Sequence, residues 1–264
     1  MLVDTHAHIH FDDFAADLVE VFGNARTSQV GAIITVGTTP QDSLKALEFV
    51  LNPEIVGLAN GIKLYATAGI HPHEASLGSD GLKEIKQLAS SDKYSGALVA
   101  IGECGLDYYR NNSPKTQQLE ALEFQLQLAQ ELDLPLVFHV RDAWEDFFAI
   151  IKNYPKVRGV IHSFTGTTKE VEQAMGYELY FGLNGIMSFT KDQAQLEAAK
   201  IIPTGRLLLE TDCPYLSPAP IRGKRNEPSF IKYTGEFLAE LRGEQYPELI
   251  SSTGTNAKAL FKLK

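Results

Sequence analysis

The first stretch that constrains the fold lies at residues 2–8 and reads Leu2-Val3-Asp4-Thr5-His6-Ala7-His8. It begins with apolar residues, as a buried strand does, and it ends in two histidines separated by one residue. Side chains two residues apart on a strand point to the same side, so His6 and His8 can bind one cation together. A solitary His-x-His pattern is more often part of a surface turn, so its meaning depends on the rest of the chain.

Seven more short apolar runs follow, and amphipathic segments separate them. The expected strands cover residues 2–5, 32–36, 64–69, 98–102, 136–140, 159–162, 179–182 and 207–211. Amphipathic helices are expected at 116–131, 142–152 and 191–200; in the first of these, apolar residues recur at steps of three and four. Residues 228–264 are expected to form two more helices, which complete an outer ring or close the bottom of a barrel.

This alternation of strands and helices predicts the fold class. Strands that are apolar on both faces are typical of a parallel sheet covered by helices. The length of 264 residues matches the usual size of a (β/α)₈ barrel. We therefore predict an α/β protein, a (β/α)₈ TIM-type barrel with an outer ring of helices, formed by residues 1–264 as one domain. An open doubly wound sheet is the alternative fold.

The composition excludes several classes of protein. Two cysteines argue against a disulfide-stapled secreted scaffold, and no apolar run approaches the ~18 residues of a membrane span. The chain does not begin with a basic and apolar leader, so a cytoplasmic protein with no membrane partner is expected. We also expect it to be a monomer. The formal net charge of −9 argues against a broad basic surface for DNA, but it leaves a local basic patch or a metal-bridged phosphate site open.

Residues that can bind a metal follow almost every expected strand. They are His6, His8, His71, Glu103, His139, His162, Asn184 and Asp212. The carboxyl ends of all eight strands of such a barrel converge on one mouth, so these residues become neighbours there. Six of the seven histidines lie at or just after a strand end, and His10 follows closely.

Each acidic or imidazole group in this set has a functional and a structural interpretation. Glu103, between two glycines, can bridge two metals, or it can form a salt bridge to an arginine of the barrel. His139 and His162 form a second ligand pair, or they are core histidines with satisfied hydrogen bonds. Asp212 is expected to be both a metal ligand and the general base, whereas Glu210 orients an imidazole or a water or forms a salt bridge.

Other residues near the mouth complete the expected site. His71 joins Asp212 and Glu210 as a candidate catalytic residue, and Arg141 is expected to clamp a phosphate or to anchor a carboxylate. A loop punctuated by proline and glycine places Arg222, Lys224 and Arg225 beside the mouth, where they can contact phosphates or remain a solvated surface. Four aromatic residues that follow strand ends could stack on unpaired bases: Tyr108, Tyr109, Phe164 and Tyr215. Asp4, His10 and Asp107 are weaker candidates, and Cys104 and Cys213 are expected to be small buried thiols.

The ligand set indicates the chemistry. Four histidines, one glutamate and one aspartate without a thiolate suit Zn²⁺, Mn²⁺ or Mg²⁺. Six ligands are too many for one catalytic cation, so they divide into two sites bridged by Glu103. Two metals can hydrolyse a phosphodiester, and equally an amide or an ester, and the ligands alone do not decide between these. No P-loop, Rossmann fingerprint or nucleophile elbow is present.

The motifs together resemble those of the TatD-type metal-dependent deoxyribonucleases of the amidohydrolase superfamily, over the whole chain. The matching segments are residues 4–8 (DTHAH), 69–73 (GIHPH), 102–108 (GECGLDY), 138–141 (FHVR), 162–166 (HSFTG), 209–214 (LETDCP) and 222–228 (RGKRNEP). The resemblance implies two divalent metal ions, one held by His6, His8, Glu103 and Asp212 and the other by Glu103, His139 and His162. It further implies a 3′-to-5′ exonuclease that acts on single-stranded DNA ends.

Two other functions remain open at the level of sequence. The same metals could serve an amide or ester hydrolase that acts on a small molecule or an aminoacyl-tRNA, and a snug apolar pocket would favour that function. A non-catalytic barrel that binds nucleic acid or protein would need a defective ligand set, and no ligand position is defective here.

Overall fold

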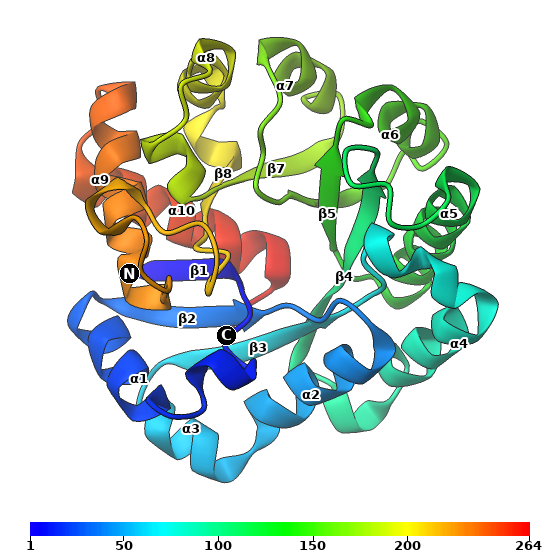
Figure 1. Ribbon diagram of the computed structural model, residues 1–264, viewed down its shortest axis with the longest axis horizontal. Coiled ribbons are helices and arrows are strands. Elements are labelled where there is room, and N and C mark those ends of the chain that lie inside the picture. The colour runs from blue at the N-terminus through cyan, green and yellow to red at the C-terminus, as the bar shows by residue number, and fades with distance from the viewer.

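A computed structural model describes all residues 1–264, and its eight strands form one parallel sheet. Each strand pairs with the next in chain order, and helices surround the strands (Figure 1). The strands are β1 (Leu2–Ala7), β2 (Val30–Thr35), β3 (Lys63–Ala68), β4 (Leu98–Asp107), β5 (Leu136–Arg141), β6 (Arg158–Ile161), β7 (Glu178–Leu183) and β8 (Leu207–Leu209). The predicted (β/α)₈ barrel is confirmed.

At least one helix follows each strand, which is the pattern that a parallel barrel requires. The ten α-helices are α1 (Leu18–Thr27), α2 (Pro40–Leu51), α3 (Pro53–Ala59), α4 (Gly78–Ala89), α5 (Lys115–Leu132), α6 (Trp144–Ile151), α7 (Thr168–Ala174), α8 (Gln193–Ile201), α9 (Ile231–Arg242) and α10 (Tyr246–Phe261). The three helices expected from amphipathic patterns correspond to α5, α6 and α8. None of these helices combines the length and the apolar character that crossing a membrane demands.

Strands occur at all eight expected places, and most of their ends lie within one or two residues of the prediction. The ends of β4 and β8 bear most on the site. β4 continues to Asp107 because it regains its pairing with β5 after a register shift between Ile101 and Cys104. β8 ends at Leu209 instead of residue 211, because Thr211 bonds to β1 and Asp212 adopts a left-handed conformation with φ +58°. Both departures lie where the chain builds the candidate site.

The barrel closes between β1 and the segment after β8. The Thr5 hydroxyl donates to the Leu209 carbonyl at 3.0 Å, and the Asp212 N–H donates to the His6 carbonyl at 2.8 Å. Buried Asp4 accepts bonds from the backbone N–H of Thr211 at 2.9 Å and from its hydroxyl at 2.6 Å. Asp4, a weak candidate for supporting His6, therefore mainly fastens the two ends of the sheet together.

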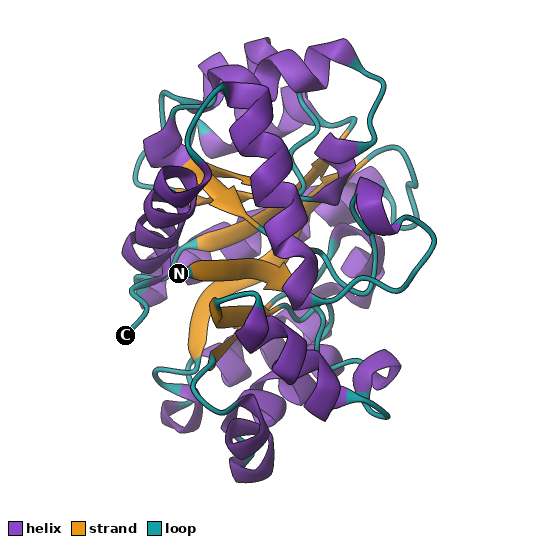
Figure 2. Ribbon diagram, turned by 90° about the vertical axis from the view of Figure 1, so that its left-hand side faces the viewer, coloured by secondary structure: helices purple, strands orange, loops and turns teal.

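Two hydrophobic clusters fill the molecule on either side of the sheet. The larger cluster packs the strands against the surrounding helices, which lie above, below and in front of the strands in Figure 2. The smaller one combines Val3, Tyr65 and Val137 of the barrel interior with Leu260 and Phe261 of α10. Of the two alternatives for residues 228–264, α9 therefore completes the ring beside α8, and α10 closes the amino-terminal end of the barrel.

Candidate metal centre

Glu103 occupies the middle of the candidate site. It lies in the irregular part of β4, where the preceding Gly102 has a φ of +139°. A Cβ at Gly102 would lie 2.5 Å from the Val137 carbonyl oxygen, so only glycine fits there. The Glu103 side chain is nearly fully buried, and its two oxygens face different histidines.

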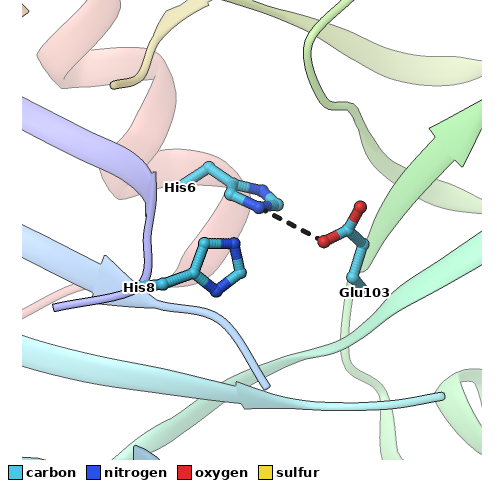
Figure 3. A group of neighbouring side chains, drawn as sticks. All are labelled: His6, His8 and Glu103. Carbon is cyan, nitrogen blue, oxygen red and sulfur yellow. Dashed lines mark ion pairs between the residues drawn. The ribbon is translucent and has the colours of Figure 1, made fainter. Parts of the chain in front are cut away.

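One oxygen of Glu103 faces the histidines of β1. Figure 3 shows His6 and His8 approaching Glu103 from the end of β1. The His6 Nε2 atom lies 3.3 Å from Glu103 Oε2 and 3.7 Å from Asp212 Oδ1. The His8 Nε2 atom lies 3.5 Å from the same Asp212 oxygen. These four residues form the first group of potential ligands.

The other oxygen of Glu103 faces three further histidines. Glu103 Oε1 lies 3.0 Å from His139 Nδ1, 3.3 Å from His162 Nε2 and 3.3 Å from His71 Nε2. A carboxylate with one set of imidazoles on each oxygen is arranged as a bridge between two cations would be. The structure thus brings together all six sequence-predicted ligands, and it adds His71 to them.

Hydrogen bonds hold one ring nitrogen of three of these histidines. The Nδ1 atom of His8 donates to the Val36 carbonyl at 2.9 Å, and that of His162 donates to Glu210 Oε1 at 3.2 Å. The Nε2 atom of His139 donates to Asp107 Oδ2 at 3.1 Å. In each ring the opposite nitrogen faces a carboxylate, and when the ring is neutral this nitrogen carries a lone pair, as in histidines that bind metals.

Lone pairs that face carboxylates repel unless a positive charge lies between them. Burial opposes protonation of His162, but Glu103 and Glu210 raise its pKa well above the ordinary value. Burial and the charge of His162 lower the pKa of His6, whose ring stacks on that of His162 at 3.7 Å. Both ring nitrogens of His6 are buried without a hydrogen-bond partner. The residues present therefore fit a divalent cation better than they fit a set of buried imidazolium ions.

His71 differs from the other histidines of the cluster. Its Nδ1 atom accepts a bond from the backbone N–H of His73 at 3.1 Å, so its proton lies on Nε2 and points toward Glu103. Burial lowers the pKa of His71 to about 4, which keeps the ring neutral at physiological pH. His71 is thus a hydrogen-bond donor to Glu103 in this arrangement.

Two histidines that follow strand ends do not face Glu103. His10 bonds to the Thr35 hydroxyl at 2.6 Å and to Asp42 at 3.0 Å, which turns it away from the cluster. His73 donates to Asp107 Oδ2 at 2.9 Å, so Asp107 holds both His73 and the ligand candidate His139. Sequence reasoning missed His73, although its position two residues after His71 was a signal for it.

Glu210 lies beneath the cluster and is completely buried. Its Oε1 atom accepts bonds from the Ser163 N–H at 2.6 Å, from Asn184 Nδ2 at 3.1 Å and from His162. No lysine or arginine approaches it, so the geometry favours the orienting role over the salt bridge. Cys104 and Cys213 are free, buried thiols whose pKa burial raises, as expected.

The basic residues beside the mouth are held to different degrees. The Arg222 guanidinium lies 3.8 Å above the Phe189 ring and donates to the Ser217 carbonyl at 3.0 Å. Lys224 is exposed, whereas Arg225 forms a two-point pair with Asp17, at 2.6 and 3.1 Å. A phosphate can therefore reach Arg222 and Lys224 directly, and it reaches Arg225 only if that pair opens.

Arg141 and the aromatic residues complete the rim. Arg141 lies 3.9 Å above the ring of Tyr109. Tyr109 and Tyr215 are 59% and 55% exposed, but Arg141 covers one face of the Tyr109 ring, so Tyr215 is the more available for stacking. Phe164 is only 2% exposed and packs against other aromatic rings of the core, so its expected role in stacking is wrong. The Tyr108 hydroxyl donates to Asp146 at 2.7 Å and ties that ring to α6.

The comparisons with known proteins agree with this geometry. A family model described as TatD related DNase matches residues 3–262. The chain is 39% identical over 266 residues to an uncharacterized metal-dependent hydrolase, YabD, of Bacillus subtilis, and the alignment covers 100% of both chains. It is 38% identical over 271 residues to the 3′-5′ ssDNA/RNA exonuclease TatD of Erwinia tasmaniensis, covering 99% of this chain and 100% of that one.

A solved structure supports the same relationship. The crystal structure of YJJV, a TatD homologue from Escherichia coli K12, superposes with a TM-score of 0.90 and 27% identity, covering 100% of this chain and 98% of that one. The likeness thus extends over both complete chains and includes the barrel itself. This chain belongs to the TatD related DNase family, and it is a metal-dependent hydrolase of ester bonds.

Proposed function

We propose that the protein is a divalent-metal-dependent deoxyribonuclease that releases nucleotides from single-stranded DNA ends in the 3′-to-5′ direction. The observation that carries this proposal is the bridging arrangement of Glu103, with His6 on one oxygen and His139 and His162 on the other. The name of the Erwinia tasmaniensis relative, a 3′-5′ ssDNA/RNA exonuclease, supports the polarity and the choice of substrate.

The two groups of side chains divide between two cations. His6, His8 and Asp212 would hold one cation together with Glu103, and His139 and His162 would hold the other. Mg²⁺, Mn²⁺ and Zn²⁺ all suit these nitrogen and oxygen donors. When bound, two such ions polarise the phosphodiester and lower the pKa of water.

The protein's own residues supply the remaining functions. Asp212, whose side chain is 15% exposed, can be reached from the mouth and accepts a proton from the attacking water. Glu210 holds the His162 ring in place, and His71 donates a hydrogen bond to Glu103. Arg141, Arg222 and Lys224 bind the phosphates of the strand, and Arg225 joins them once it leaves Asp17.

The net charge of −9 is compatible with this substrate. Two divalent cations offset the ligand carboxylates, and substrate attraction is confined to the mouth and to the loop that carries Arg222. Such a local field suits an enzyme that holds one strand end briefly. A monomeric protein of one domain over residues 1–264, placed in the cytoplasm, completes the proposal; the two free cysteines support a reducing compartment.

Nucleotide release from 3′-labelled single-stranded DNA tests the proposal. The metal-free protein is assayed with Mg²⁺, Mn²⁺ or Zn²⁺, alongside the Asp212→Asn variant, and bound metal is counted by elemental analysis. We expect release that requires a divalent cation and that falls by about a factor of 100 or more in the variant. Absence of release with every cation, or a variant as active as the wild type, would refute it. Hydrolysis of a small ester without competition from DNA would favour the alternative hydrolase.

A further inference from the structure

An exposed tyrosine beside the metal centre has no part in the chemistry described above. Tyr215 follows Asp212 by three residues, and its side chain is 55% exposed. Its ring centroid lies 6.3 Å from that of His8, in an edge-on orientation. Its hydroxyl forms no hydrogen bond within the protein, and no cationic side chain stacks on its ring. The ring therefore lies beside the mouth, and its aromatic faces and hydroxyl are free to contact a ligand.

The backbone holds Tyr215 firmly in this position. The Tyr215 N–H donates to the Asp212 carbonyl at 2.9 Å, and the Asn226 side chain donates to the Tyr215 carbonyl at 2.6 Å. The next residue, Leu216, adopts a left-handed conformation with φ +56°, which persists only where the surroundings enforce it. A large aromatic ring is thus presented to solvent from a rigid segment, so little ordering entropy is lost when a ligand covers it.

A phosphate-binding group lies on the same segment. The Arg222 guanidinium donates to the Ser217 carbonyl, two residues after Tyr215, and stacking on Phe189 keeps it in place. A flat aromatic surface and a fixed guanidinium on the same segment can recognise one strand through a base and a phosphate.

We propose that Tyr215 stacks on the base of a nucleotide that flanks the scissile phosphodiester, while Arg222 binds a phosphate of the same strand. This inference rests on the proposed nuclease function and adds a base subsite to it. Every base has a flat aromatic face, so the subsite accepts any sequence but requires an unpaired base. Tyr109, the other exposed tyrosine of the rim, is less suited because Arg141 already covers its ring at 3.9 Å.

A double-mutant cycle tests the subsite, in which a side chain of the protein and a base of the oligonucleotide are removed singly and together. Wild-type protein, Tyr215→Ala, Tyr215→Phe and Tyr109→Ala are titrated with a fluorescent single-stranded oligonucleotide whose terminal linkages are phosphorothioates that resist cleavage. Matched oligonucleotides lack the base at the terminal, the penultimate or a distant internal position, and anisotropy reports binding. Melting temperature and Mn²⁺ affinity confirm that each variant is folded and retains its metal centre.

We expect Tyr215→Ala to weaken binding of the intact oligonucleotide about tenfold, as base stacking on a tyrosine predicts. The loss should disappear when the base at one flanking position is absent, and Tyr215→Phe should bind as the wild type does. Equal weakening with intact and base-free strands, or a base-dependent loss only in Tyr109→Ala, would overturn the subsite. If that happens while the wild type still releases nucleotides, the nuclease function stands. If the wild type neither binds nor cleaves DNA, both proposals fail.

Discussion

The substitution Glu210→Gln separates the orienting role of this residue from its role in packing. Three donors converge on Glu210 Oε1: the Ser163 N–H at 2.6 Å, Asn184 Nδ2 at 3.1 Å and His162 Nδ1 at 3.2 Å. Glutamine has nearly the same shape and keeps one carbonyl oxygen for these donors. It removes the negative charge that holds the proton on His162 Nδ1, so the opposite ring nitrogen becomes a weaker ligand.

The magnitude follows from the change in a single hydrogen bond. A bond to a charged acceptor contributes about 1.5–3 kcal/mol and a neutral one about 0.5–1.5 kcal/mol, so the bond to His162 weakens by about 1–1.5 kcal/mol. That corresponds to a metal affinity lowered about 5- to 12-fold. Glu210 Oε2 is buried without a partner, so a glutamine N–H₂ placed there lacks an acceptor and costs a further ~1–3 kcal/mol of folding stability.

Titration calorimetry of the metal-free protein with Mn²⁺ measures the affinity, and thermal melting measures the stability separately. Glu170→Gln is the matched control, because Glu170 is also buried and accepts bonds from Thr167 at the start of α7 without touching the cluster. The control should lower the melting temperature and leave Mn²⁺ affinity unchanged. A folded Glu210→Gln protein with wild-type affinity, or an equal loss of affinity in the control, would contradict the reasoning.

Cation removal, a core truncation and alkaline pH test other parts of the structure. Chelation of divalent cations should lower the melting temperature, and Mn²⁺ at about 100 times its dissociation constant should restore roughly 2.7 kcal/mol; a melting temperature that ignores Mn²⁺ would argue against the site. Phe138→Ala removes a fully buried ring whose centroid lies 5.2 Å from that of Phe147. Urea denaturation should therefore show a free energy of unfolding lowered by about 3–5 kcal/mol. Burial, and then the charge of Glu236, raise the pKa of Tyr246 to about 12, so its neutral form is favoured in the folded state. This stabilisation is complete below the unfolded pKa of about 10 and is lost as pH rises to about 12, and Tyr246→Phe should abolish that part of the pH dependence.

The strands and the main helices could be predicted because their signals are local. Apolar runs of a few residues mark the barrel strands, and the predicted helix at 116–131 differs from α5 (Lys115–Leu132) by one residue at each end. The positions of His6, His139 and His162 at strand ends then follow from chain order, since parallel strands end at one mouth. These parts of the site needed no knowledge of distant contacts.

The departures all involve partners that are far apart in the sequence. β8 ends early because Thr211 bonds to Asp4, 207 residues away. Arg225, expected to contact phosphate, pairs with Asp17, which lies 208 residues away. Phe164 follows a strand end as Tyr215 does, but its ring turns into the core. A local pattern contains no information about such partners.

The metal centre likewise combines features that the sequence determined with features that depend on the tertiary structure. The amino-acid sequence determined which ligand types are available and that the barrel would collect them at its mouth, because strand order and side-chain alternation are properties of the chain itself. Only the tertiary structure decided that His10 turns away to Asp42, that His71 points a proton at Glu103, and that each Glu103 oxygen faces its own histidines. The proton position on an imidazole depends on the acceptor at its other nitrogen, and those acceptors come from elements that only folding brings together.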